Sequence, residues 1–372
     1  MSDSRRNEKK HINKVRIAKY ILHQGETSKP EIASELNISM PTVLQNIKEL
    51  EEGGVVAEVG EYQSTGGRKA KAISIKNDCG YAVGIDITAN HISYVMIDLC
   101  GKLVGHERVR HVFENTMDYY ENLSEELAIF IKKAAVDKKK ILGVGVSFPG
   151  IIDKTNDMII RSHILELSNV SLKNIRQQIP YEVMFENDAN SAALAEVMGS
   201  REDAVYLSLS NSVGGAIYMN HSIFVGDNFK SAEFGHLIID ANGKECYCGK
   251  KGCADAYCNA RILAGITNNK LNDFFTILEQ GDQKCRKAWQ EYLDYLAVTV
   301  SNLRMTFDCN IILGGYVGAY LPPYMNELSR KVMEYNKFES DTAYIRNCKY
   351  TTEAAATGIA MTFVEKYFEQ LK

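Results

Sequence analysis

The chain has 372 residues, 45% of them hydrophobic, so it can bury a large core and form two or three domains of ordinary size. No apolar run approaches the roughly eighteen residues that cross a bilayer, and the charged start lacks the apolar stretch of a signal peptide. We therefore expect a cytoplasmic protein without membrane insertion. Nine cysteines in a chain this long argue against a secreted disulfide scaffold, and the spacing of Cys246, Cys248 and Cys253 indicates a metal.

The formal net charge of -4 conceals an uneven distribution. Residues 1–19 hold seven Lys and Arg residues against two acidic ones, while the acidity lies downstream. Cations gain affinity for DNA by displacing its counterions, so a basic segment on an acidic body is typical of a phosphate-contacting module. For the first residues alone, a solvated, disordered start is an equally good interpretation.

Two helices are predicted in the first 36 residues. Apolar residues at helical spacing over 15–22 indicate a helix that ends near Gly25. Ser28 and Glu31 then have the spacing of a capping box, in which Ser28 covers the free amides of the first turn and Glu31 reaches back.

A third helix completes a helix-turn-helix. Asn37 can adopt the left-handed conformation of the turn, and Ser39 is expected to cap a helix with a buried stripe of Val43, Ile47 and Leu50. The other face carries residue types that contact base edges in a major groove. The predicted recognition residues are Pro41, Thr42, Leu44, Gln45 and Lys48.

A hairpin follows this helix. Residues 55–60 alternate as a strand, 64–67 form a turn, and 68–75 return, which is typical of a wing. Two glycines at the tip allow close approach to DNA, where Arg68 and Lys69 would contact phosphate or the minor groove. Helix trios also occur in modules that bind no DNA, but the agreement of caps, turn, wing and basic residues favours DNA binding.

The remainder of the chain reads as a duplicated α/β unit, in which three strands precede helices. A ligand would bind in the cleft between the two sheets. The expected strands are 81–87, 91–98, 103–110 and 141–146 in the first copy and 204–210, 214–219 and 222–224 in the second, with helices at 117–135 and 285–307.

Four motifs in this body resemble the ROK family of repressors, open reading frames and kinases. They are GVGVSFPG at 143–150, ENDAN at 186–190, EFGH at 233–236 and CYCGKKGC at 246–253. The resemblance covers essentially the whole chain. It implies a winged helix-turn-helix over 1–76, then an actin-like ATPase fold of the sugar kinase and hexokinase type, with subdomains over 77–200 and 201–372.

The cysteine motif predicts a zinc site. One imidazole and three thiolates, from His236, Cys246, Cys248 and Cys253, suit a closed tetrahedral structural zinc. The glycines at 249 and 252 would let the loop fold round the ion. By resemblance, the zinc also orients His236 toward the sugar.

The resemblance further implies a sugar site. The position of Asp188 is that of the catalytic base that accepts the proton of the attacking sugar hydroxyl in family kinases, a role that applies here only if kinase activity is retained. Asn187, Glu233, His236 and Asp255 would hold sugar hydroxyls with it. Asp255 stands where the family usually has Glu, and its shorter arm leaves the sugar open. Alternatively, Asn187 and Asp188 form a helix N-cap.

Departures from the kinase pattern affect the phosphate loops. Family kinases follow their first strand with Asp-x-Gly-Gly-Thr, whereas Asp86 is followed here by Ile-Thr-Ala-Asn, and the Gly-Thr-Gly of the second loop is replaced by Ser-Asn-Ser at 210–212. Side chains obstruct close backbone approach to phosphates, on which phosphoryl transfer depends. We therefore expect weak binding of ATP and Mg²⁺. The pair Gly314-Gly315 survives, but a turn explains it equally well.

The resulting hypothesis is a sugar-responsive transcriptional repressor of carbohydrate-metabolism genes. A homodimer or homotetramer would bind palindromic operator double-stranded DNA, and a small-molecule sugar effector would change the spacing of the two recognition helices. By resemblance, the effector could instead be a sugar-transport protein. The alternative is an active ATP-dependent sugar kinase, of the hexose or N-acetylhexosamine type, with a fused DNA-binding domain.

Overall fold

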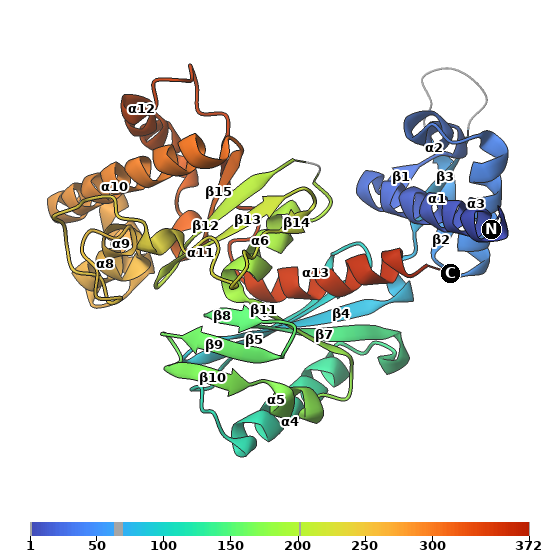
Figure 1. Cartoon of the computed structure of the whole chain (residues 1–372), viewed down its shortest axis with the longest axis horizontal. Coiled ribbons are helices and arrows are strands. Elements are labelled where there is room, and N and C mark those ends of the chain that lie inside the picture. The colour runs from blue at the N-terminus through green and yellow to red at the C-terminus, as the bar shows by residue number, and fades with distance from the viewer. Residues whose placement is uncertain (1, 63–69, 201, 372) are drawn as a thin grey trace. The chain divides into compact units, whose positions relative to one another are not determined.

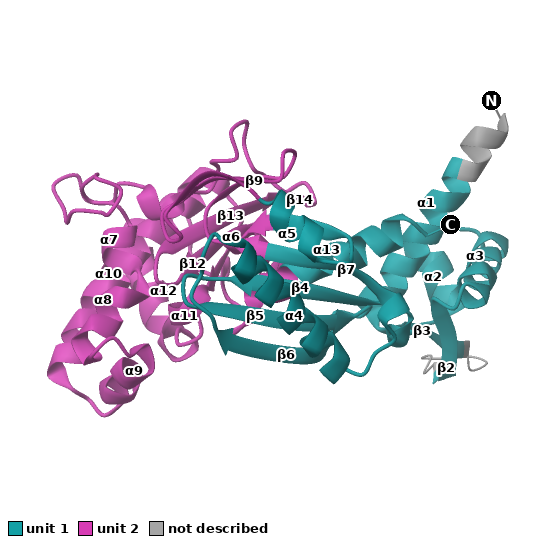
Figure 2. Ribbon diagram, turned by 90° about the horizontal axis from the view of Figure 1, so that it is seen from below, with its two compact units in different colours: residues 1–146, 172–185, 359–372 teal, residues 147–171, 186–358 magenta. Residues whose placement is uncertain are grey.

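The structure is a computed structural model that describes residues 2–62, 70–200 and 202–371 (Figure 1). It divides into two compact units, one of residues 1–146, 172–185 and 359–372 and one of residues 147–171 and 186–358 (Figure 2). The described residues contain no helix long and apolar enough to cross a membrane. The tripartite boundaries at residues 76 and 200 stay a prediction.

The N-terminal part is the expected winged helix. Its sheet has the order β1-β3-β2. Its elements are α1 (Ser2–Gln24), β1 (Glu26–Thr27), α2 (Lys29–Leu36), α3 (Met40–Glu52), β2 (Val56–Tyr62) and β3 (Ala70–Ile75). The helix α1 begins at Ser2, so the first residues are helical rather than a disordered tail.

The helix ends follow the predicted local chemistry in part. The Ser28 hydroxyl accepts the Glu31 amide at 3.4 Å, and Asn37 closes α2 at φ 52°. The Glu31 carboxylate, however, accepts the Thr27 hydroxyl at 2.8 Å, so the box is not reciprocal. Ser39 occupies the predicted N-cap position of α3, but the predicted hydrogen bond from a helix amide to its side chain is absent. Its hydroxyl pairs with the Thr42 hydroxyl instead.

Two five-stranded sheets form the body, and they have the same topology. Their orders are β11-β7-β4-β5-β6 and β14-β13-β12-β15-β16, each with an antiparallel three-strand meander on one side. This confirms the predicted duplication. The first sheet contains β4 (Tyr81–Ile87), β5 (His91–Asp98), β6 (Leu103–Arg110), β7 (Ile141–Phe148) and β11 (Val183–Asn187); the second contains β12 (Ala204–Leu209), β13 (Val213–Met219), β14 (Ser222–Ile223), β15 (Asn310–Gly314) and β16 (Ile345–Asn347).

A small sheet between β7 and β11 in the chain was not predicted. It has the order β10-β9-β8 and is formed by β8 (Ile151–Asp153), β9 (Met158–Ser162) and β10 (Leu167–Ser171). The helices of the body are α4 (Met117–Lys133), α5 (Lys173–Gln178), α6 (Asp188–Val197), α7 (Asp255–Cys258), α8 (Ala260–Ala264), α9 (Leu271–Glu279), α10 (Gln283–Phe307), α11 (Gly315–Gly318), α12 (Met325–Tyr335) and α13 (Ala354–Glu369).

Helix α13 packs so closely on its neighbours that they have glycine at the contacts. A Cβ at Gly143 or Gly145 of β7 would lie 2.0 Å from the Phe363 ring or 2.5 Å from the Ile359 side chain. Within α13 itself, a Cβ at Gly358 would lie 1.7 Å from the Ser191 carbonyl of α6. These glycines therefore serve packing, since real Cβ atoms do not approach so closely.

The last turns of α13 contact α1. Lys19 pairs with Glu365 at 2.5 Å and with Glu369 at 3.4 Å, and the His11 ring is 2.9 Å from the Leu371 carbonyl. Within the first unit, the start and end of the chain are thus held together by charged and polar contacts.

Two ion pairs, both partly buried, hold α3 to α1. Glu49 of α3 pairs with Lys10 at 2.5 Å and with Lys14 at 2.6 Å, and Lys14 is almost fully buried. Hydrogen bonds from Lys10 and Lys14 lower the pKa of Glu49 to about 2. The ionised carboxylate therefore stabilises the packing of α3 on α1.

We predict that Glu49→Gln destabilises the protein by about 1 kcal/mol at pH 7, since partly exposed ion pairs contribute little more. Because the pKa of Glu49 is lowered on folding, its contribution is full above about pH 4.5 and is lost as the pH falls toward 2. Urea midpoints of both proteins, measured between pH 7 and pH 3, should therefore converge at low pH. A difference that stayed constant with pH would contradict this role.

Candidate functional site

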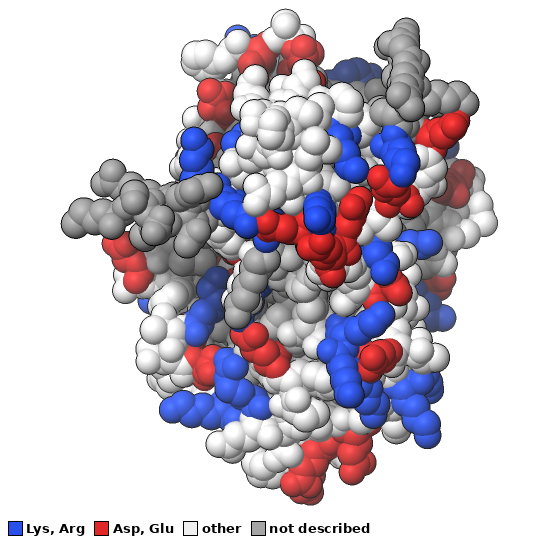
Figure 3. Space-filling view, turned by 90° about the vertical axis from the view of Figure 1, so that its right-hand side faces the viewer, with Lys and Arg blue, Asp and Glu red and all other residues white. Residues whose placement is uncertain are grey.

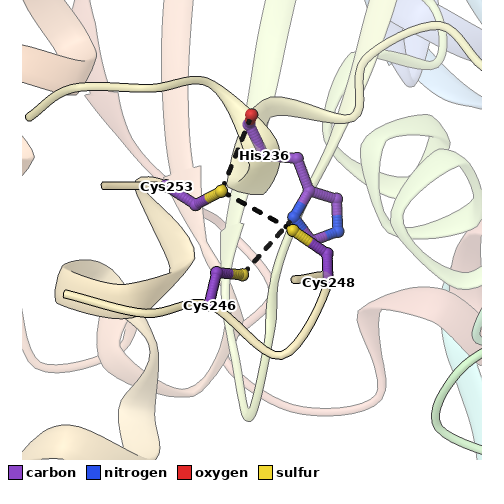
Figure 4. A group of neighbouring side chains, drawn as sticks. All are labelled: His236, Cys246, Cys248 and Cys253. Atoms are coloured by element: carbon purple, nitrogen blue, oxygen red, sulfur yellow. Dashed lines mark hydrogen bonds between the residues drawn. The ribbon is translucent and has the colours of Figure 1, made fainter. Parts of the chain in front are cut away.

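The four predicted metal ligands lie together. Nitrogen and sulfur ligand atoms of His236, Cys246, Cys248 and Cys253 all lie within 4.8 Å of one another, and the side chains point toward one centre (Figure 4). The Sγ atoms of Cys248 and Cys253 are 3.7 Å apart, and Cys246 Sγ is 3.7 Å from His236 Nδ1. Tetrahedral zinc with bonds of about 2.0–2.3 Å would separate such donors by roughly 3.5–3.8 Å. The cluster can therefore hold a metal ion.

The loop round this cluster depends on its glycines. Gly249 and Gly252 have φ +87° and +74°, a conformation that favours glycine, and a Cβ at Gly252 would lie 1.6 Å from the Asp240 carbonyl. Tyr257 of α7 holds the same loop, since its hydroxyl accepts the Lys244 amide at 2.6 Å. The core helix α10 in turn supports α7, where Tyr292 donates to the Cys258 carbonyl at 2.6 Å.

Asn187 and Asp188 lie at the junction of β11 and α6. The Asn187 Oδ1 accepts the Asn190 amide at 2.9 Å, so Asn187 is the N-cap of α6, which the sequence had left as an alternative. Its Nδ2 donates to the Gly150 carbonyl at 2.9 Å and to Asp188 Oδ1 at 3.1 Å. These bonds fix the Asp188 side chain, which is partly exposed in the first turn of α6.

Buried Glu186 supports this junction from behind. It accepts the amide of Asn187 at 2.9 Å and the side-chain amide of Asn190 at 3.0 Å, and it pairs with Lys154 at 2.6 Å. Sequence reasoning gave Glu186 no role of its own. Its position in the ENDAN motif was the available signal, because a carboxylate that is 5% exposed requires such partners.

Glu233 and His236 flank the short turn Phe234–His236. Glu233 is exposed as a whole residue, but partial desolvation by the surrounding protein raises the pKa of its carboxyl. Desolvation also lowers the pKa of His236, against the opposing charge of Asp255. A Cβ at Gly215 would lie 2.2 Å from the Phe234 ring, so β13 packs directly on this turn.

Asp255 is engaged by the protein itself. Its side chain is 3% exposed; Oδ1 accepts the Val213 amide at 2.6 Å, and Oδ2 lies 3.3 Å from Asn259 Nδ2. The carboxylate thus joins α7, beside the metal cluster, to the start of β13. Gly214 follows Val213, and a Cβ there would lie 3.3 Å from Ala189 of α6. Strand β13 therefore brings the ENDAN motif and the metal loop together.

Side-chain hydroxyls make local hydrogen bonds at the two altered phosphate loops. In the first, the Thr88 hydroxyl donates to the His91 carbonyl at 3.0 Å and accepts the His91 amide at 3.1 Å. In the second, the hydroxyls of Ser208 and Ser210 are 3.2 Å apart. Gly315 has φ +77°, and a Cβ there would lie 2.6 Å from the Ser210 hydroxyl, so packing accounts for this glycine.

Most of the residues predicted to contact DNA bases lie on the exposed side of α3, and their role in DNA binding stays a prediction. Pro41, Leu44, Gln45 and Lys48 are exposed on α3 and Thr42 is half-buried, whereas Val43, Ile47 and Leu50 are buried. The predicted contacts Arg68 and Lys69 lie outside the described residues. On the face viewed in Figure 3, basic side chains are interspersed with acidic ones.

Comparison with known proteins shows the family. Residues 82–366 match the ROK family and residues 11–57 match a winged helix-turn-helix DNA-binding model. The chain belongs to the ROK family. This confirms the predicted fold class.

Named relatives are similar over much of the chain. The xylose repressor of Bacillus subtilis (strain 168) is 27% identical over 335 residues, which cover 87% of each protein. The transcriptional dual regulator NagC of Escherichia coli (strain K12) is 26% identical over 74% of this chain and 67% of its own. The crystal structure of a ROK family transcriptional regulator, a homologue of the E. coli MLC protein, has the same fold, with a TM-score of 0.74, 19% identity and coverage of 97% of this chain and 98% of its own.

We predict that Asp255→Ala lowers the free energy of unfolding by about 1–3 kcal/mol, because it leaves the buried Val213 amide without its acceptor. Asp255→Asn should cost less, because the amide oxygen can still accept that bond. Denaturant midpoints of the three proteins check this order. Equal midpoints for wild type and Asp255→Ala would show that the bond contributes nothing.

Proposed function

We propose that this protein is a sugar-responsive transcriptional repressor of carbohydrate-metabolism genes. The observation that carries the proposal is the union, in one chain, of an exposed recognition helix with a ROK body that retains the sugar motifs and lacks the glycine-rich phosphate loops. Relatives named xylose repressor and N-acetylglucosamine repressor support it. A sugar regulates only by binding one arrangement of the protein more tightly than the other.

In this proposal the sugar is held by Asn187, Asp188, Glu233 and His236, with Asp255 at the same site. Carboxylates and a side-chain amide can orient several hydroxyls at once. The bonds of Asp255 to Val213 and Asn259 support a positioning contribution from that residue. A homodimer or homotetramer would present two recognition helices to successive major grooves of operator DNA.

The central test is a thermal-shift screen with D-xylose, D-glucose, N-acetyl-D-glucosamine and their phosphates, and with Mg-ATP in separate wells. We expect one sugar to raise the melting temperature, since a ligand of the folded state must do so, and to change the affinity for an operator obtained by selection from random DNA. Mg-ATP should have no effect. If no sugar altered operator affinity, the sugar-responsive mechanism would be wrong.

The alternative is an active sugar kinase with a fused DNA-binding domain. It would use Asp188 as the base, and an enzyme-linked assay with Mg-ATP would show turnover that Asp188→Asn abolishes. The family includes kinases, but the replacement of the phosphate-loop glycines by residues with side chains, among them Thr88 and Ser210, favours a regulator without phosphotransfer.

We predict different effects for two recognition-helix variants. Gln45→Ala should weaken binding to the selected operator by about 1–3 kcal/mol and relax its sequence preference, because an amide reads base edges. Lys48→Ala should weaken binding to all sequences and reduce the salt slope by about 1, as expected of a phosphate contact. Fluorescence anisotropy at several salt concentrations separates them. Lys133→Ala, an exposed lysine of α4, is the control.

We further propose that the cluster of His236 and three cysteines holds a structural zinc ion. When bound, zinc would fix the loop and the ring of His236. Mass spectrometry of metals should find about one zinc per chain, and Cys248→Ser should reduce this content and lower the melting temperature. Cys100→Ser, an exposed cysteine outside the cluster, is the control. Unchanged zinc in Cys248→Ser would contradict the site.

A further inference from the structure

Tyr247 stands between Cys246 and Cys248 in the sequence. Its hydroxyl is 3.2 Å from His236 Nε2. The other ring nitrogen, Nδ1, is the one near Cys246 Sγ. The imidazole thus directs Nδ1 into the cluster and Nε2 toward Tyr247. Sequence reasoning gave Tyr247 no role.

The Tyr247 ring contacts two imidazoles. It packs edge-on against His236, with ring centroids 5.3 Å apart, and against His163, with centroids 5.7 Å apart. His163 belongs to the connection between β9 and β10. Asp255 and Glu233 lie within electrostatic reach of the phenol. Tyr247 therefore stands among the residues proposed to hold the sugar, although its side chain remains 55% exposed.

His236 Nε2 can make only one good hydrogen bond at a time. An imidazole nitrogen has either one proton to donate or one lone pair to accept with. If His236 Nε2 binds a sugar hydroxyl, it cannot at the same time bind the Tyr247 hydroxyl. The phenol, being exposed, can exchange this bond for water at small cost.

We propose that Tyr247 occupies, in the sugar-free protein, the position of the sugar hydroxyl that His236 binds, and that the sugar displaces it. This inference rests on the proposed sugar site. Tyr247 is then a residue that sets sugar affinity by competition. It lowers the affinity for ligands that offer no hydroxyl to His236, because these cannot replace the hydrogen bond between Tyr247 and His236 that they displace.

The test is sugar binding by Tyr247→Phe, which keeps the ring contacts with the two histidines and removes only the competing hydroxyl. Calorimetric titration with D-xylose, D-glucose and N-acetyl-D-glucosamine should give a dissociation constant about 2–10-fold lower than in wild type, the range that corresponds to one net hydrogen bond. Tyr335→Phe, an exposed tyrosine of α12, should bind as wild type does. Unchanged metal content and circular dichroism would show that the cluster and fold are intact.

The outcomes separate the two proposals. Tighter binding by Tyr247→Phe alone supports the displacement, and equal or weaker binding overturns it while leaving the sugar site in place. Binding of these sugars by neither protein overturns the proposed sugar response and this inference with it. A second readout follows the Tyr247 ring by fluorine NMR of protein that contains 3-fluorotyrosine. The resonance that is absent from Tyr247→Phe is assigned to residue 247, and we expect it to shift when sugar is added. A resonance that did not move would contradict displacement.

Discussion

The buried bond between the Asp255 carboxylate and the Val213 amide holds the site together. On one side it fixes α7 and, through it, the loop that carries the cysteines. On the other it fixes the start of β13, whose glycines contact α6 and the turn before His236. A carboxylate with 3% exposure is stable only when its oxygens have partners, so Asp255 and β13 determine each other's positions. Residues from three distant motifs thereby share one rigid support.

Residue periodicity and turn residues were enough to predict the longer strands and helices. The meander strands at 81–87, 91–98 and 103–110 have the predicted bounds, because each is a short run rich in strand-forming residues. The short strands β8 to β10 were missed, since their apolar pattern spans only a few residues. The packing role of the glycines at 143, 145 and 358 was not predicted, because they are contacts between helix α13 and its neighbours that only the tertiary structure reveals.

The candidate site also has features that the sequence predicted and features that it did not. The spacing of His236 and the cysteines predicted their convergence, because the ligand types and the loop glycines already specify tetrahedral geometry. The N-cap bond of Asn187 was available from the sequence as an alternative, but the bonds of Asn187 to Gly150, of Glu186 to Lys154 and of Asp255 to Val213 were not predicted, since each joins residues far apart in the chain. The contact between Tyr247 and His236 likewise depends on how the loop folds back, which spacing alone does not specify.

The position of α13 in the first unit has a consequence for synthesis of the protein. Residues 359–372 are synthesised after the whole of the second unit, yet they cover the glycine face of β7 and pair with Lys19 of α1. The second unit is therefore complete in sequence before the first one can close. During that interval β7 lacks its contacts with Ile359 and Phe363, and incompletely packed intermediates of this kind aggregate and bind chaperones.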